Sequence, residues 1–381
     1  VSFSDPASGL VANGSSISGT PNAAGTVTVT ITARDPGGLQ VTDTFDITIG
    51  NMTMSGTNIL FIIADDMGQD SSAQYMLSTD RPITPQLDAL AANGLVFDNL
   101  WVNPVCTPTR ASMLSGNYGL RTNVLAVGDE FPTSETILHR FLAETPESAN
   151  YASAMIGKWH LGGGRTGPAD AGIDHFAGII GGGVSDYYDW TLNVNGTNTQ
   201  TTTYATTEIT NQAISWVQGQ TSPWFMWVAY NAPHTPFHLP PATLHSRNLS
   251  GTAADINANP RPYFLAAIEA MDAEIGRLLD ALPTAVRNNT VIVFVGDNGT
   301  PGQVRDLSVF PAGAKGTLFE GGVRVPMIVS GAGVTRSGQR EEALINGVDF
   351  YATIAELTGQ ILPAIGDSRS FAGVLNGTGA A

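Results

Sequence analysis

Cys106 is the only cysteine in 381 residues, and Pro108 and Arg110 follow it at intervals of two. A short helix that begins just after this cysteine would direct backbone N–H groups and the positive end of its dipole at a bound anion. The guanidinium of Arg110 suits a tetrahedral oxyanion. The Cys-x-Pro-x-Arg stretch therefore predicts a nucleophile placed in an anion site. The alternative for a single cysteine is a small buried apolar residue.

Four oxygen-bearing side chains stand close behind two apolar segments. An acidic pair directly follows residues 58–64, and an Asp-Asn pair follows residues 290–295 after one glycine. Carboxylate and amide oxygens are the ligands that calcium and magnesium prefer, and no Cys or multi-His cluster favours zinc. Either pair alone could instead be a turn that closes a strand. The four predicted metal ligands are Asp65, Asp66, Asp297 and Asn298.

The lysines and two of the six histidines also occur in short motifs. Fifteen of the seventeen basic residues are arginine, so that Lys158 and Lys315 are the only lysines. Lys158 shares the sequence Gly-Lys-Trp-His-Leu-Gly with His160, and His234 lies in Asn-Ala-Pro-His-Thr-Pro. The choice of lysine at these two positions indicates a need for compact ammonium groups. Each residue alone could be a surface lysine or a core histidine.

Composition limits the class of protein and of partner. The net charge is −16, which argues against a nucleic-acid partner. If the substrate is anionic, cations must therefore be concentrated at the site. No apolar run approaches the roughly 18 residues expected of a membrane span. One cysteine excludes an internal disulfide and a cysteine-rich zinc site.

The candidate residues follow segments whose hydrophobic pattern predicts an α/β domain. Apolar strands alternate with amphipathic helices, which favours a largely parallel sheet with helices on both faces. Ligands of such sheets bind beyond the carboxyl ends of the strands, where these motifs stand. We expect strands at 58–64, 151–156, 224–230 and 290–295, and helices at 84–93, 205–217 and 263–282.

Residues 1–50 have a different pattern. Alternating apolar residues and threonines over 27–33 and 41–49 predict two strands joined by the turn Asp-Pro-Gly-Gly at 35–38. We predict an all-β module at 1–50, a polar linker at 51–57 and a catalytic domain at 58–381. The module is too short for a whole sandwich of roughly 100 residues.

Six motifs, in order, resemble those of the type I sulfatases, which have an alkaline-phosphatase-like three-layer fold. They are the strand into Asp-Asp, Cys-x-Pro-x-Arg, Gly-Lys-Trp-His-Leu-Gly, Pro-His-x-Pro-Phe at 233–237, Asp-Asn-Gly, and the stretch 315–326. The resemblance covers about residues 58–376. Residues 17–49 resemble the last strands of the immunoglobulin-like and cadherin-like repeats of secreted bacterial proteins. We therefore expect a partial module of that kind before the catalytic domain.

The sulfatase resemblance implies a role for each candidate residue. Cys106 would be oxidised by a maturation enzyme to formylglycine, whose hydrate attacks a sulfate ester and then expels sulfate. Calcium, or magnesium in its place, would be held by the four oxygen ligands together with the modified Cys106. Arg110 and Lys158 would polarise the hydrate, and His160 would remove its proton. The residues that would grip sulfate and assist the leaving oxygen are His234 and Lys315.

Three readings of the function stay open. The leading one is a sulfatase acting on an aryl or carbohydrate sulfate. The second is a phosphodiesterase or phosphonate monoester hydrolase of the same superfamily. The third is an inactive carbohydrate-binding or adhesion protein. The resemblance also implies a secreted, periplasmic or cell-surface location. Because the family continues into a small C-terminal subdomain, we expect that subdomain to be missing after Ala381.

Overall fold

The computed structural model of the chain describes residues 2–3, 10–13, 16–19, 25–49, 56–145, 151–360 and 366–378. The chain divides into two compact units, residues 1–55 and residues 56–381. The unit boundary falls within the predicted linker at 51–57, of which residues 51–55 lie outside the described ranges. None of the helices in the described ranges is both long and apolar enough to cross a membrane.

The first unit contains β-strands among its described residues. Strand β4 (Gly25–Arg34) pairs antiparallel with β5 (Gln40–Ile49), and Gly38 closes the turn between them with a φ of 88°. Val27 and Val29 are buried, as their alternation with threonine predicted. The identity of this unit as an immunoglobulin-like or cadherin-like module stays a prediction. The other strands are β1 (Ser2–Phe3), which pairs with β4, and the hairpin β2 (Leu10–Asn13) with β3 (Ser16–Gly19).

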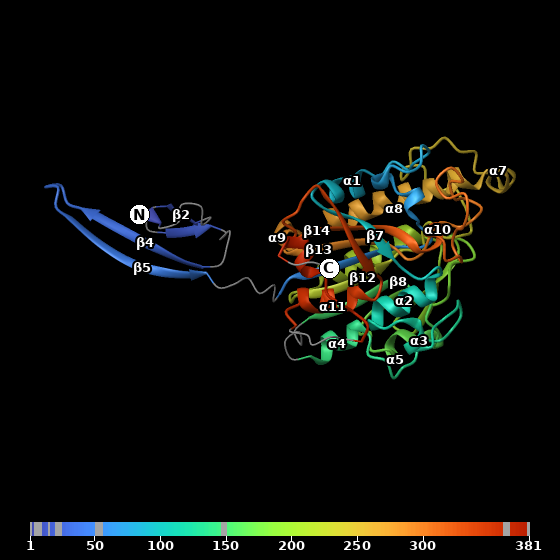
Figure 1. Cartoon of the computed structure of the whole chain (residues 1–381), viewed down its shortest axis with the longest axis horizontal. Coiled ribbons are helices and arrows are strands. Elements are labelled where there is room, and N and C mark those ends of the chain that lie inside the picture. The colour runs from blue at the N-terminus through green and yellow to red at the C-terminus, as the bar shows by residue number, and fades with distance from the viewer. Residues whose placement is uncertain are drawn as a thin grey trace. The chain divides into compact units, whose positions relative to one another are not determined.

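The second unit is built on a ten-stranded sheet in the order β11-β10-β9-β8-β12-β6-β13-β14-β7-β15 (Figure 1). The pairings give eight strands the same direction, and β10 and β14 the opposite one. The mostly parallel sheet is therefore confirmed. Its strands are β6 (Asn58–Ala64), β7 (Gly94–Trp101), β8 (Ala152–Lys158), β9 (Phe176–Ile179), β10 (Trp190–Val194), β11 (Thr197–Thr201), β12 (Trp224–Ala229), β13 (Thr290–Gly296), β14 (Arg324–Gly331) and β15 (Gln339–Asn346).

Helices cover both faces of this sheet, which gives three layers (Figure 1). The long helix α8 (Pro260–Asp280) packs with α1 (Pro85–Ala92) and α6 (Ala205–Gln218) on one face. Helices α2 (Cys106–Ser115), α4 (Leu138–Glu144) and α11 (Asp349–Leu357) pack together on the other. Shorter helices are α3 (Gly119–Thr122), α5 (Gly167–Asp170), α7 (Ala253–Ala258), α9 (Thr284–Asn288), α10 (Glu320–Val323) and α12 (Ala372–Asn376).

Strand β6 shows why a continuous apolar run belongs at the centre. All seven of its residues are buried, since helices cover both faces. Leu60 and Ile62 belong to the same apolar cluster as the inner face of α8. Phe61 points the other way, stacks on Trp227 at 4.6 Å between ring centroids and meets the ring of Phe350 edge-on at 4.9 Å.

Two helix starts differ from the sequence prediction. The amphipathic helix expected at 263–282 is α8, which begins at Pro260 and ends at Asp280. Thr84 occupies the N-cap position of α1, but its side chain makes no capping bond. The carboxylate of Asp272 on α8 instead accepts hydrogen bonds from the backbone N–H groups of Gln86 (3.0 Å) and Leu87 (2.8 Å).

Candidate active site

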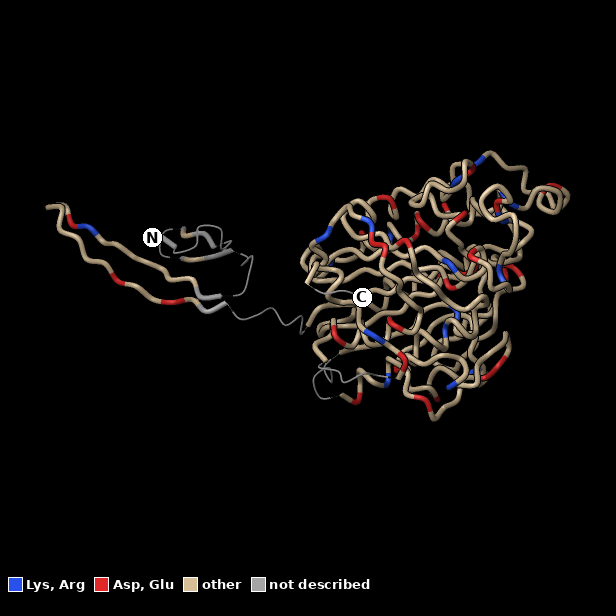
Figure 2. Tube along the Cα trace, viewed as in Figure 1, with Lys and Arg blue, Asp and Glu red and all other residues tan. Residues whose placement is uncertain are grey.

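The predicted site residues come together at the carboxyl ends of the central strands of the sheet. Strands β8, β12, β6 and β13 are neighbours and parallel, so their carboxyl ends lie side by side. Lys158 ends β8, the acidic pair at 65–66 follows β6, and His234 and residues 297–298 follow β12 and β13. Helix α2 brings Cys106 and Arg110 to the same place. Acidic positions outnumber basic ones along the chain (Figure 2), yet three cations converge here.

Cys106 is the first residue of α2, one position earlier than the sequence suggested for the helix start. Its side chain is 1% exposed, and its Sγ lies 3.2 Å from Nδ1 of His160. Burial raises the pKa of the Cys106 thiol, although the charge of Lys158 acts in the opposite direction. The thiol form is therefore not an activated thiolate nucleophile.

Arg110 lies one turn further along α2 and links the helix to two strands. Its Nε and Nη2 donate to Oδ2 of Asp297 at 3.1 and 2.8 Å, and its Nη1 donates to the Lys158 carbonyl at 2.9 Å. The Arg110 side chain is 1% exposed and that of Asp297 is fully buried. Burial, followed by the charge of Asp65, raises the pKa of Asp297 to about 6, while Arg110 acts to lower it.

Each lysine forms an ion pair with one member of the acidic pair. Lys158 Nζ lies 2.6 Å from Asp65 Oδ2, and both side chains are fully buried. Lys315 Nζ lies 2.5 Å from Asp66 Oδ1, with the lysine side chain 21% exposed. Burial alone would raise the pKa of Asp65, but the charge of Lys158 and weaker cationic contributions hold it below its usual range. The lysines are thus ionic partners inside the site.

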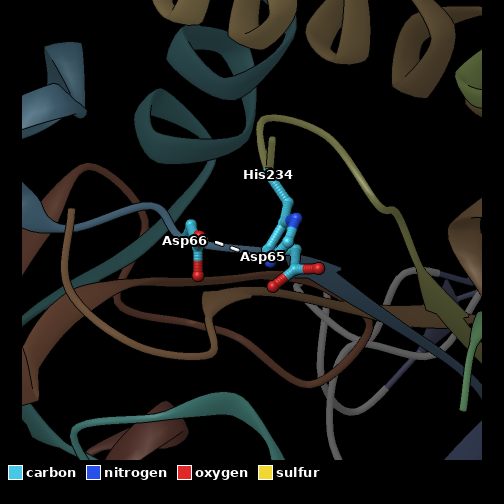
Figure 3. Close-up of side chains that lie close together, drawn as sticks. All are labelled: Asp65, Asp66 and His234. Atoms are coloured by element: carbon cyan, nitrogen blue, oxygen red, sulfur yellow. Dashed lines mark ion pairs between the residues drawn. The ribbon is translucent and has the colours of Figure 1, made fainter. Parts of the chain in front are cut away.

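Oxygen atoms suited to a hard cation gather in the same place. Ligand atoms of Asp65, Asp66 and His234 lie within 4.8 Å of one another (Figure 3). Oδ1 of Asp65 and Oδ1 of Asn298 are buried and accept no hydrogen bond from the described residues. Unpaired buried oxygens are unfavourable unless a cation or water occupies the space between them. The donor set therefore fits calcium or magnesium, with His234 close by as one nitrogen.

Asp297 is placed differently from the other three predicted ligands. Its Oδ2 already accepts from Arg110, and its Oδ1 accepts from the backbone N–H of Asp66 at 3.0 Å. The amide of Asn298 donates to Oδ1 of Asp66 at 2.8 Å, which leaves the Asn298 carbonyl oxygen free. Asp297 thus fixes neighbouring residues as well as offering oxygen.

Two site residues have a left-handed backbone that non-glycine residues rarely adopt. Asp66 has a φ of 73° and His160 a φ of 59°. A Cβ atom at Gly182 would lie 2.6 Å from Nε2 of His160, so only glycine allows the chain to pass so near the imidazole. Burial, with the charges of Lys158 and Arg110, lowers the pKa of His160 to about 3. The imidazole is therefore neutral near pH 7, with one unprotonated ring nitrogen that can accept a hydrogen bond.

His234 lies at the rim of the site, held by residues that the sequence did not single out. Its side chain is 20% exposed, and its Nε2 is 3.8 Å from Oδ2 of Asp66. The buried hydroxyl of Tyr187 lies 2.7 Å from the His234 carbonyl and 2.9 Å from the Asn231 carbonyl, and it accepts from Nδ2 of Asn231 at 2.9 Å. In the sequence, Asn231 is only the first residue of the Asn-Ala-Pro-His-Thr-Pro motif, and no local pattern indicates a role for Tyr187.

Comparison with known proteins gives consistent matches to one family. A family model described as Sulfatase matches residues 57–360. Arylsulfatase G of Rattus norvegicus is 30% identical over 376 residues, with 83% of this chain and 67% of the relative covered. Arylsulfatase J of Mus musculus is 29% identical (82% and 54% covered), and human N-acetylgalactosamine-6-sulfatase is 29% identical (81% and 63% covered). The chain thus spans between about half and two thirds of the length of each of these relatives.

Solved structures show the same fold. A crystal structure of Ps i-CgsB in complex with k-i-k-neocarrahexaose superposes on this chain with a TM-score of 0.70 and 27% sequence identity. The alignment covers 81% of this chain and 73% of the Ps i-CgsB chain. A structure in complex with D-glucosamine-2-N,6-O-disulfate has a TM-score of 0.68 at 22% identity, with 85% and 81% covered. These matches agree with the three-layer architecture.

Proposed function

The chain belongs to the sulfatase family, and on that premise we propose that it hydrolyses an aryl or carbohydrate sulfate ester with a formylglycine derived from Cys106. The cluster of three cations and an oxygen-rich metal site around one buried cysteine carries this proposal. A sulfate ester needs cations for its oxygens, a nucleophile for sulfur and a proton donor for the leaving oxygen.

The charges of the site explain how an acidic chain binds an anionic ester. Three carboxylates face three cations, so the side chains alone balance at neutral pH. A bound divalent cation would leave the site with a net charge of about +2. The local field would then attract the substrate although the whole chain carries −16. The three acid–cation pairs are Asp297 with Arg110, Asp65 with Lys158, and Asp66 with Lys315.

The side chains that would hold the metal are Asp65, Asp66, Asp297 and Asn298. Calcium, or magnesium in its place, would supply a Lewis acid for the sulfate oxygens when bound. Lys158 and Lys315 hold the two adjacent carboxylates with their oxygens oriented and their charges compensated. The free Oδ1 atoms of Asp65 and Asn298 support the assignment of this site to a metal.

We assign the nucleophile to a modified Cys106, because burial raises the pKa of its thiol and so disfavours the thiolate. Oxidation to an aldehyde would supply, as its hydrate, two hydroxyl groups in place of one thiol. Nδ1 of His160 lies within hydrogen-bond reach of that position, and we assign it as the proton acceptor there. Arg110 fixes the N-terminal turn of α2, so the reacting atom is held by the helix and not by a mobile loop.

Burial separates the residues that hold the nucleophile from those that meet the substrate. Arg110 and Lys158 are at most 1% exposed, whereas the side chains of His234 and Lys315 are 20% and 21% exposed. A substrate entering from solvent reaches the second pair first. We assign His234 and Lys315 to sulfate binding and to proton donation to the leaving oxygen.

Turnover of matched esters tests this function. The chain, coexpressed with a formylglycine-generating enzyme, is assayed on 4-nitrophenyl sulfate, on sulfated sugars, and on the corresponding phosphate mono- and diesters. We expect sulfate hydrolysis that depends on the maturation enzyme. Faster hydrolysis of the phosphate esters would favour the phosphodiesterase alternative. No turnover of any ester by chain shown to carry formylglycine would favour the inactive binding protein.

The proposed chemistry also implies partners and a location. The substrate is a sulfated small molecule or glycan, as the names of the arylsulfatase and N-acetylgalactosamine-6-sulfatase relatives suggest. The maturation enzyme is a second partner, because the thiol must be oxidised before turnover. A secreted, periplasmic or cell-surface location stays a prediction from the sequence resemblance.

A further inference from the structure

A polar cavity of about 430 Å³ lies beside the candidate active site, and none of the roles proposed above uses it. Its volume is within the roughly 300–1,000 Å³ typical of small-ligand sites. The buried side chains of Ile179, Val184 and Trp190 form an apolar part of its lining. Arg165, Asp189 and polar residues of the β10–β11 hairpin contribute the charged and polar part. We call this space the side cavity.

The side cavity is joined to the site through the backbone. The N–H groups of Trp159 and His160 donate to the carbonyls of Ile179 and Ile180 at 2.8 and 3.1 Å, so the catalytic segment lies against the cavity wall. Gly181 and Gly183 continue that wall. A Cβ at Gly183 would lie 3.3 Å from Nδ1 of His234. The segment 181–183 thus lies close to both proposed catalytic histidines, His160 and His234, and also contributes to the cavity wall.

The order of strands in the sheet places the cavity beside the reacting groups, at the same carboxyl ends of the parallel strands. The site uses the carboxyl ends of β8, β12, β6 and β13, and β9 is the next parallel strand beyond β8. Ile179 is the last residue of β9 and lines the cavity. A ligand that places a sulfate at Cys106 can therefore extend along these strand ends towards β10.

The polar groups of the cavity are suited to a sugar. Asn198 receives a hydrogen bond at Oδ1 from Asn193, which leaves its own Nδ2 without a partner among the described residues. Asp189 accepts from Gln200 through Oδ1 and keeps Oδ2 for a further donor. An apolar surface next to free amide and carboxylate groups is the arrangement that a sugar ring with hydroxyl groups requires.

Arg165 adds a positive charge that forms no ion pair with Asp189, the carboxylate in the cavity lining. It is exposed, and it makes no ion pair or side-chain hydrogen bond within the described ranges of the chain. Among the described residues, nine of the other fourteen arginines form ion pairs. A free guanidinium in a chain of net charge −16 favours an anionic ligand group at this place.

We propose that the side cavity binds the neighbouring sugar of a carbohydrate sulfate, and that Arg165 contacts a second anionic group on that sugar. The inference rests on the proposed sulfatase function and deepens it. The substrate is then an oligosaccharide with at least two negative charges, one on the sulfate that is cleaved and one, a sulfate or a carboxylate, that is retained.

Calorimetric binding to the Cys106→Ala chain tests the inference without turnover. The probes are disaccharides of chondroitin 6-sulfate, heparin and carrageenan, each paired with the monosulfated monosaccharide of its reactive end. The heparin and carrageenan disaccharides include a second sulfate, and the chondroitin disaccharide carries a carboxylate. We expect Arg165→Ala to weaken binding of at least one disaccharide about 10-fold and to leave its monosaccharide within about twofold.

Two further variants separate the cavity from general effects. Gly181→Leu should also weaken the disaccharide, because a Cβ at Gly181 meets nothing within 4 Å and the added side chain enters the cavity without a backbone clash. Arg287→Ala is the control. Arg287 lies in α9, directly before β13, and therefore at the amino ends of the strands, away from the carboxyl ends where the cavity lies. We expect it to leave every affinity unchanged.

The outcomes distinguish the two proposals. Equal weakening of mono- and disaccharide by Arg165→Ala, no weakening of any disaccharide, or no binding of any disaccharide to the parent chain would overturn the cavity assignment. Disaccharide binding that depends on Arg165, in a chain that carries formylglycine but hydrolyses no sulfate, would support the cavity and overturn the sulfatase function.

Discussion

At the scale of single residues, burial determines what each charged group in the site can do. Arg110, Lys158 and Asp65 are inaccessible, so removal of any one leaves its partner charged in a site with little water. The exposed fractions of His234 and Lys315 allow them to contact a ligand. The sequence motifs named all of these residues. They could not reveal the division into deep and rim groups, because burial depends on helices and strands distant in the chain.

Substitution of Cys106 tests the nucleophile directly. Cys106→Ser keeps one hydroxyl but provides no aldehyde, so sulfate transferred to it could not be expelled by a second hydroxyl. We expect at most one stoichiometric burst and a loss of steady turnover of about 1,000-fold or more. Burst kinetics on 4-nitrophenyl sulfate measure this, and mass spectrometry locates any sulfated serine. Steady turnover near the parent rate would rule out the hydrate mechanism.

Substitution of Arg110 tests the deep ion pair. Arg110→Ala leaves the buried carboxylate of Asp297 without its main partner, so we expect the free energy of unfolding to fall by about 3–5 kcal/mol. Arg121→Ala is the matched control, because the Arg121 side chain is 64% exposed where it pairs with Asp367, and its loss should cost less than about 1 kcal/mol. Chemical denaturation compares the two variants. Equal losses would show that burial of the Arg110 pair is unimportant.

At the scale of elements, the site depends on strands and helices that end at the same place. The strands at 58–64 and 290–295 could be predicted because their apolar runs are continuous, and the structure shows β6 and β13 paired in parallel there. The cap of α1 could not be predicted, since Asp272 lies 185 residues after Leu87. The β10–β11 hairpin was also missed. The alternation in β10 spans only five residues, and β11 contains no apolar residue at all.

Metal binding should stabilise the ends of β6 and β13 together. The side chains that directly follow these strands are the proposed metal ligands. A metal that binds only the folded state raises the free energy of unfolding by about 2.7 kcal/mol at 100 times its dissociation constant. We expect calcium to raise the melting temperature of the chelated chain and to restore its activity. Asp65→Asn should remove most of the calcium-dependent shift. The same shift in Asp65→Asn as in the parent would exclude Asp65 as a ligand.

The buried cap on α1 should make stability depend on pH. Burial raises the pKa of Asp272 to about 7, although the N–H groups of Gln86 and Leu87 act to lower it. The folded state then binds a proton more tightly than the unfolded state, so this contribution to stability is present below about pH 4 and is lost as the pH rises towards 7. Relative to Asp272→Asn, the parent should lose about 1–3 kcal/mol between pH 4 and pH 7.5. Denaturation curves at several pH values measure the difference; a constant difference would show that Asp272 does not titrate in this range.

At the scale of the whole molecule, the second unit contains all the proposed machinery. The family match at 57–360 begins almost where that unit begins, at residue 56. The α/β class, the mostly parallel sheet and the position of the site at its carboxyl edge followed from strand–helix alternation. The full strand order did not, because β14 and β10 run against the others and no local pattern sets their neighbours.

Expression of residues 56–381 alone tests this division. We expect the shortened chain, once matured, to hydrolyse 4-nitrophenyl sulfate with a kcat within about twofold of the full chain, since every proposed catalytic and metal residue lies within it. Its melting temperature should match that of the corresponding transition in the full chain. A large loss of activity with correct maturation would assign residues 1–55 a part in catalysis.

The lateral position of the side cavity has a consequence for how such enzymes diverge. Its outer wall belongs to the β10–β11 hairpin at one margin of the sheet, whereas the reacting side chains belong to the central strands and α2. If the side cavity binds a sugar as proposed, insertions or substitutions in the hairpin can alter which sugar is accepted without moving the proposed metal ligands or Cys106. Selection for a new substrate and conservation of the reaction can act on separate parts of the chain, so that lineages can acquire new specificities in small, individually viable steps.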